Sequence, residues 1–170
     1  MAWLRPRRAL IAVMLGATLI GSAASTALAT GPSVRGGGVL GGSPGATSQV
    51  AFTATELGGS FLCVMAGRSG GFPFPPWQSV QQMLVQGRVT PGSLKIGASG
   101  VATFDGIATV HVIGRDASGR PLAATVHDVG FTSTQAAGGA GVGWHQLDLP
   151  SLGVHIPVET LIAGRITISP

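Results

Sequence analysis

Four histidines and six acidic residues are the side chains of this 170-residue chain that can do acid–base or metal chemistry. His111 and His127 fall on the two arms of a predicted hairpin, where alternation places both on one face, diagonally about 7–8 Å apart. Two imidazoles hold a metal ion poorly without a third or fourth ligand, and Asp128 is predicted to point to the other face. We therefore expect no metal site, with His111 and His127 as the only weak candidates.

The acidic residues are spread singly along the sequence. They are Glu56, Asp105, Asp116, Asp128, Asp148 and Glu159. Calcium loops crowd several oxygen ligands into about a dozen residues, and no such cluster is present. Distant acids can still meet in space as a glycosidase pair, and a histidine meeting an aspartate at a cleft would favour an enzyme. Without such convergence, we expect no catalysis, no catalytic residues and no cofactor.

Cys63 is the only cysteine, so no disulfide can form within the chain. Its neighbours are Phe61, Leu62, Val64 and Met65, and an apolar strand of this kind predicts a small buried side chain rather than a reactive thiol. An intermolecular disulfide is the alternative.

The segment 71–77 is rich in proline and aromatic residues, reading Gly-Phe-Pro-Phe-Pro-Pro-Trp. Prolines hold such a loop extended and can present its rings to a sugar, a peptide or a lipid surface. Phe72, Phe74 and Trp77 are therefore the hypothetical binding residues. The alternative is that the rings fold back and plug one end of the domain.

The rest of the chain predicts short strands separated by Gly, Pro and Ser, without a window of helical periodicity. The expected strands are 50–57, 61–66, 80–89, 93–96, 101–113, 122–129, 144–149 and 164–168. Alternation is clearest in the hairpin 109–129, where pairing Val110 with Val126 and Val112 with Ala124 buries one aliphatic face. About eight strands at this spacing predict an all-β antiparallel β-sandwich, immunoglobulin-like or Greek-key.

The first 47 residues read as two segments that precede this domain. Arg5, Arg7 and Arg8 are followed by an apolar stretch and by Ala27-Leu28-Ala29, the pattern of a cleaved signal peptide over residues 1–29. Residues 30–47 are rich in Gly, Ser and Pro and predict a flexible leader. The β-sandwich domain is then expected over residues 48–170.

Removal of the signal would leave seven of the ten basic residues against six acids, a net charge of about +1. Such a surface attracts neither nucleic acid nor anionic lipid, so nucleic-acid binding is excluded. The apolar part of the signal is shorter than the roughly 20 residues of a spanning helix, and no membrane anchor is expected after cleavage. Nine arginines against a single lysine, together with abundant Ala and Gly, indicate a bacterial source.

Four short motifs lie in the second half of the chain: Val85-x-Gly87-x-Val89-Thr90, Ala102-Thr103-Phe104-x-Gly106-x-Ala108-Thr109-Val110, Thr125-Val126-x-Asp128-x-Gly130 and Gly164-x-Ile166-x-Ile168. Over residues 85–170 they resemble a group of uncharacterised bacterial secreted β-domains. In that group a Pro-Gly turn and another acid follow the position of Gly130, where this chain has Phe131. The resemblance implies a β-sandwich and export, and it implies no activity.

The sequence therefore predicts a secreted, non-catalytic β-sandwich with a structural or binding role. The loop 71–77 would contact a cell wall, a polysaccharide or a protein. The alternative is a small β-barrel that binds a hydrophobic ligand or acts as a simple hydrolase, which requires pairing between the first and last strands and an apolar pocket.

Overall fold

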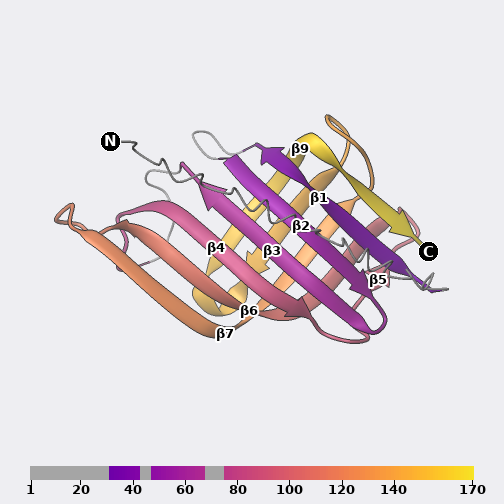
Figure 1. Ribbon diagram of the computed structural model, residues 1–170, viewed down its shortest axis with the longest axis horizontal. Helices are drawn as coiled ribbons and strands as arrows, with labels where there is room; N and C mark the ends of the chain where they lie inside the picture. The colour runs from indigo at the N-terminus through magenta and orange to yellow at the C-terminus, as the bar shows by residue number, and fades with distance from the viewer. Residues whose placement is uncertain (1–30, 43–46, 68–74) are drawn as a thin grey trace, which may run out of the picture.

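The computed structural model describes residues 31–42, 47–67 and 75–170 and shows an all-β protein (Figure 1). Its strands are β1 (Ser33–Gly41), β2 (Thr47–Thr55), β3 (Gly58–Ala66), β4 (Ser79–Val89), β5 (Lys95–Ile96), β6 (Val101–Arg115), β7 (Pro121–Ala136), β8 (Trp144–Leu149) and β9 (Val154–Ser169), with a 3₁₀ turn η1 (Pro150–Leu152) before β9. The described residues contain no helix of the length and hydropathy that crossing a bilayer requires.

Every strand pairs antiparallel with its neighbours, and the sheet closes on itself. The order is β4-β3-β2-β1-β9-β8-β7-β6-β5, and a further pairing of β4 with β6 joins the two ends. The predicted sandwich is therefore wrong: the protein is a closed eight-stranded antiparallel β-barrel, with β5 as a short extra strand on β6. Alternation did not distinguish the two folds, because it separates an inner from an outer face in both.

Strand β1 replaces the flexible leader expected over residues 30–47. It pairs with β2 along one side and with β9 along the other, and the second pairing completes the barrel. Its glycines have a packing role, because a Cβ on Gly36 would lie 2.8 Å from both Phe52 and Ile166, and one on Gly38 would lie 2.1 Å from the backbone oxygen of Ala163. A glycine-rich segment is ordered here by close backbone approach. The predicted signal peptide lies outside the described residues.

The hairpin of β6 and β7 follows the register predicted from alternation, with Val110 opposite Val126 and Val112 opposite Ala124. At its tip Oδ1 of Asp116 accepts hydrogen bonds from the backbone N–H groups of Ser118 (2.9 Å) and Arg120 (3.0 Å). The hydrogen bond from the Ser118 hydroxyl, together with these backbone bonds, lowers the pKa of Asp116 below its usual value. Asp116 thus stabilises the turn.

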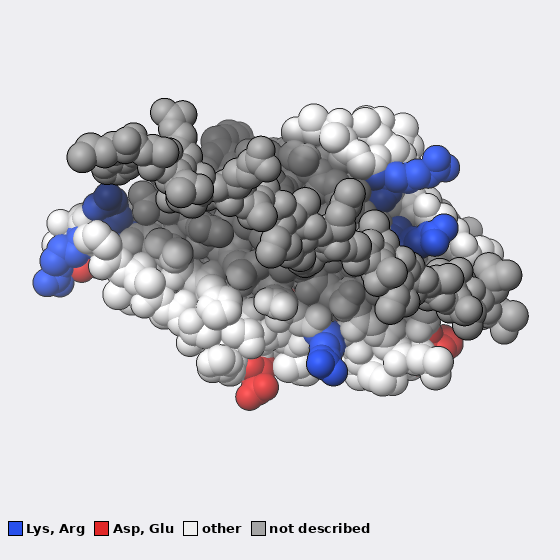
Figure 2. Space-filling view, in the orientation of Figure 1, with Lys and Arg blue, Asp and Glu red and all other residues white. Residues whose placement is uncertain are grey.

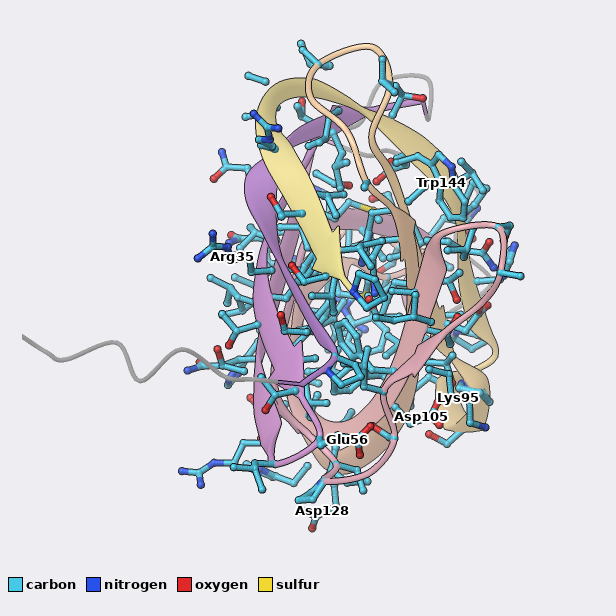
Figure 3. The ribbon with its side chains drawn as sticks, turned by 90° about the vertical axis from the view of Figure 1, so that its right-hand side faces the viewer. Arg35, Glu56, Lys95, Asp105, Asp128 and Trp144 are labelled. Atoms are coloured by element: carbon cyan, nitrogen blue, oxygen red, sulfur yellow. The ribbon has the colours of Figure 1, made fainter. Side chains whose placement is uncertain are left out.

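The barrel interior is filled by side chains from all eight long strands. Phe61 stacks on Phe131 with ring centroids 4.7 Å apart, and Phe104 meets Phe52 at 5.7 Å and Phe131 at 6.3 Å. Figure 3 faces the end of the barrel that carries Glu56 and Lys95 and shows side chains throughout the enclosed space. Burial of these rings supplies the main driving force for folding.

Candidate functional site

A hollow of about 600 Å³ lies at the barrel end where β1 begins and β9 ends. Its walls come from the β2–β3 turn, the segment around β5, the residue after β7 and the end of β9. The lining residues are Pro32, Glu56, Leu94, Ile96, Gly97, Ala98, Gly100, Ala137, Ile168 and Pro170. Glu56 has the only charged side chain among them. We call this hollow the end pocket; its size and its apolar walls suit a small ligand.

A second hollow, of about 680 Å³, lies on the outer face of β3, β4, β6 and β7. Its floor follows an irregularity in the β6–β7 pairing, where Ala108 faces Val129 but Val110 faces Val126. Thr109 therefore stands opposite two residues, His127 and Asp128, which makes a β-bulge. We call this hollow the bulge groove; its polar lining residues are Ser60, Gln86, Arg88, Thr109, His111, His127 and Asp128.

The bulge corrects the predicted orientation of Asp128. Val126 is half-buried and Val129 is buried, while both His127 and Asp128 between them are exposed. A regular strand would have sent Asp128 to the inner face, but the extra residue returns the chain to its inward register only at Val129. Asp128 has φ of 56° and is the only non-glycine residue with positive φ in the described part of the chain.

The structure brings both metal candidates, His111 and His127, to this groove together with Asp128. Nδ1 of His111 lies 2.9 Å from Oγ1 of Thr125, and Nδ1 of His127 lies 3.4 Å from Oγ1 of Thr109. Each ring is thus held by a threonine, and Nε2 is its other polar atom. Across the described residues, no three His, Cys, Asp or Glu side chains are arranged to hold a metal ion.

A polar cluster inside the barrel was not predicted from the sequence. Oγ of Ser133 donates to Oε1 of Gln135 (2.9 Å) and lies 3.1 Å from Nε2 of His145, with all three residues buried. The His145 ring stacks on Phe52 and Phe61. The alternation of the strands could have predicted this cluster. Ser133 and Gln135 lie two and four residues after the buried Phe131, and His145 lies two residues before the buried Leu147, so all three side chains point to the same inner face.

Glu159 and Ser48 are also buried polar residues of the interior, at 1% and 0% exposure. Among the described residues, five buried polar atoms have no hydrogen-bond partner: both carboxyl oxygens of Glu159, Oγ of Ser48, Nδ1 of His145 and Nε2 of Gln135. Glu159 pairs with His145 across the β8–β9 ladder. Unpartnered buried polar groups of this kind are destabilising, so the interior is not optimised for stability alone.

Two interior residues have strongly shifted pKa values. Burial lowers the pKa of His145 from 6.5 to about 4. Burial, with a smaller contribution from the charge of Glu159, raises the pKa of the Cys63 thiol to about 12. Cys63 is therefore a buried, protonated thiol, as its apolar strand predicted.

The proposed binding loop is described only in part, since Phe72 and Phe74 lie outside the described residues. Trp77 is 7% exposed, belongs to the hydrophobic core and donates from Nε1 to the backbone oxygen of Leu122 at 3.0 Å. Trp77, one of the three aromatic residues of the proposed loop, is thus held in the barrel wall. A contact surface at Phe72 and Phe74 stays a prediction.

The fourth histidine, His155, lies opposite Asp148 on the outer face of the β8–β9 pair, and the two side chains form an ion pair when His155 is protonated. Trp144 is half-buried on the outside of β8 (Figure 3). Neither residue lines the end pocket or the bulge groove.

Comparison with models of protein families, with curated proteins and with solved structures gave no match to this chain. What the protein does has therefore to be inferred from its own geometry.

Proposed function

We propose that this chain is a secreted, non-catalytic small β-barrel that binds a small, largely apolar ligand in the end pocket. The observation that supports this proposal most is the hollow of about 600 Å³. Its walls include Leu94, Ile96 and Ile168, and the side chain of Glu56 is the single charged one in the lining. Apolar walls with one polar group are typical of small-molecule sites, where the walls give affinity and the polar group gives orientation. The proposed export rests on the signal pattern of residues 1–29.

The location of the pocket supports a ligand at the rim of the barrel rather than at its centre. The middle of the barrel is occupied by packed rings, whereas Ile96 and Ile168 at the end are only half-buried. A ligand that covered them would remove apolar surface from water at about 25 cal/mol per Å². An exposed carboxylate at Glu56 would pair with a hydroxyl or amino group of that ligand.

Hydrolysis is the second candidate, because His111, His127 and Asp128 line one groove. A hydrolytic site needs a nucleophile, a base within hydrogen-bond distance and a third group that orients the base. Among the described residues, neither imidazole is hydrogen-bonded to Asp128, since each Nδ1 faces a threonine. The Ser133–His145 contact lies inside the packed barrel, where a substrate has no access. These observations favour binding over hydrolysis.

A neutral apolar fluorophore, N-phenyl-1-naphthylamine, tests the end pocket. We expect saturable enhancement of its fluorescence on addition of the protein. Ala98→Trp, at an exposed position of the lining, would fill the hollow and weaken binding at least about tenfold. Ala163→Trp is the matched control, because Ala163 is exposed on β9 and lies outside the pocket. Equal affinity of both variants and the parent protein would refute the proposal.

The loop hypothesis is tested separately. Because Trp77 is part of the core, the double variant Phe72→Ala/Phe74→Ala with Trp77 retained is the informative one. If the loop contacts a cell wall or polysaccharide, this variant is retained less on the isolated material than the parent protein. Unchanged retention would remove the loop as a contact surface.

A further inference from the structure

The bulge groove holds a set of side chains that the end pocket does not use. They project from the outer face of β4, β6 and β7 at cross-strand positions: Gln86 lies opposite Thr109, Leu84 opposite His111, and Arg88 opposite Ile107. Gln86, Arg88, His111 and His127 are exposed, so their polar groups are available to a ligand. Strand neighbours are about 4.8 Å apart, so these groups form a nearly continuous polar row across three strands.

Asp128 is the residue of this row whose backbone conformation is strained. For an L-residue other than glycine, positive φ is energetically unfavourable, and aspartate and asparagine are the types that tolerate it best. Glycine would remove that cost at the same position. The chain instead has a carboxylate there, exposed in the groove. Strain that carries a polar side chain into a hollow is the arrangement found at binding sites.

The polar side chains that line the bulge groove are better suited to bind hydroxyl groups than ions. Arg88 supplies a planar fork of donors, Asp128 supplies two acceptor oxygens, and Gln86 supplies both. In the part of the chain that the structure describes, Arg88 and Asp128 form no ion pair with each other or with another residue. A phosphate would be repelled by Asp128, and a cation by Arg88. A vicinal diol both donates and accepts, and so satisfies all three side chains.

The floor of the groove adds an apolar surface beside these polar groups. Ile107 on β6 is 50% exposed and lines the hollow. The C–H face of a sugar ring can cover Ile107 while its hydroxyl groups reach Arg88 and Asp128. The charged side chains visible in Figure 2 lie in small groups at the rim of the molecule, and both signs are present.

We propose that the bulge groove binds a neutral carbohydrate chain, with Arg88, Asp128 and Gln86 as its hydrogen-bonding residues and Ile107 as its apolar floor. The threonine contacts at Nδ1 orient the His111 and His127 rings so that Nε2 serves as a further hydrogen-bonding atom. The site is separate from the end pocket and does not depend on the function proposed for that pocket, since the two hollows share no lining residue.

Titration of the protein with cellohexaose and with chitohexaose, followed by calorimetry and by amide chemical shifts, tests this site. We expect at least one hexasaccharide to bind with a dissociation constant of about 1 mM or tighter, with shifts in β4, β6 and β7. Arg88→Ala and Asp128→Asn should each weaken binding at least about tenfold. Arg35→Ala is the matched control, since Arg35 is exposed on β1 and lies outside the groove (Figure 3).

Asp128→Gly separates binding from stability. Because glycine relieves the positive φ, this variant should unfold at a higher temperature than the parent protein and yet lose the hexasaccharide. Binding of N-phenyl-1-naphthylamine should stay unchanged in all groove variants. The proposal is overturned if neither hexasaccharide binds, if Asp128→Asn and Asp128→Gly bind as the parent does, or if inorganic phosphate binds in place of both sugars.

Discussion

Ser133 and His145 meet inside the barrel, where the serine Oγ lies 3.1 Å from Nε2 of the histidine. Because the Ser133 hydroxyl proton is donated to Gln135, the shared proton of this contact is the one on Nε2 of His145. Because burial lowers the pKa of His145 to about 4, the ring is neutral at pH 7 and Nδ1 carries no proton; among the described residues Nδ1 has no hydrogen-bond partner. A second proton would have to enter a site packed between Phe52 and Phe61.

The burial of His145 predicts a loss of stability in acid. Its pKa falls from 6.5 to about 4 on folding, so between these values the unfolded chain binds a proton that the folded chain does not. Above pH 6.5 the residue contributes nothing; as the pH falls from 6.5 to about 4 the free energy of unfolding decreases by about 1.4 kcal/mol per unit, roughly 3 kcal/mol in all. Urea unfolding at several pH values measures this slope.

His145→Gln is the control, because glutamine can still donate to Ser133 and does not titrate. Between pH 6.5 and about 4, the free energy of unfolding should fall less steeply with decreasing pH in the variant than in the parent protein, because the variant lacks the titration of His145. Equal slopes in the two proteins would contradict the assignment.

Cys63 should resist thiol reagents in the folded protein. Its side chain is 2% exposed and its pKa is raised to about 12, so both access and the thiolate fraction are low. We expect reaction with Ellman's reagent at pH 8 to be at least about 100-fold slower than in guanidinium chloride. Rapid labelling of the folded protein, or a dimer that reductant dissociates, would show that the thiol is accessible.

Gly106 and Gly130 are neighbours on the β6–β7 ladder and should respond oppositely to alanine. A Cβ on Gly106 would lie 2.3 Å from the backbone oxygen of Arg88 and 2.4 Å from the Phe131 ring, whereas one on Gly130 has no atom within 4 Å. Gly106→Ala should destabilise the protein by at least about 2 kcal/mol, through strain in the packed barrel.

Gly130→Ala should be neutral, or stabilising by up to about 1 kcal/mol, because alanine reduces the entropy of the unfolded chain. Thermal unfolding of the two variants side by side measures the difference. Similar losses in both would show that the space around the two positions is not as different as the geometry requires.

Strand β1 should be required for folding, because it closes the barrel between β2 and β9. Removal of residues 31–42 exposes two sheet edges and the ends of the packed core. A chain that starts at Gly31 should unfold cooperatively, whereas one that starts at Thr47 should not, as followed by circular dichroism on heating. Cooperative unfolding of the shorter chain at the same temperature would mean that β1 is dispensable.

The sequence predicted those parts of the fold that depend on local alternation. The register of Val110 with Val126 followed from apolar residues at every second position, and the range of β8 was predicted without error for the same reason. Closure of the sheet could not be predicted in this way. It depends on pairing of β1 with β9, and the glycines of β1 have no side chains to reveal a buried face.

The candidate site, like the fold, was predicted correctly only where local alternation determines it. His111 was expected to share a face with His127, and the structure confirms it. The placement of Asp128 was wrong, because a bulge adds one residue to β7 and leaves no signal in the alternation before it. The apolar end pocket gathers segments that are distant in sequence, from Pro32 to Ile168, and only the closed barrel brings them together.

The pairing of Ser33 with Ser169 joins the two extremes of the described chain. β1 is synthesised long before its partner β9, so the chain carries an open sheet edge on β1 until β9 has been made. Closure of the barrel therefore waits for β9. Any premature stop codon upstream of β9 would leave a product that exposes β1 and β8, and quality-control proteases would be expected to remove it.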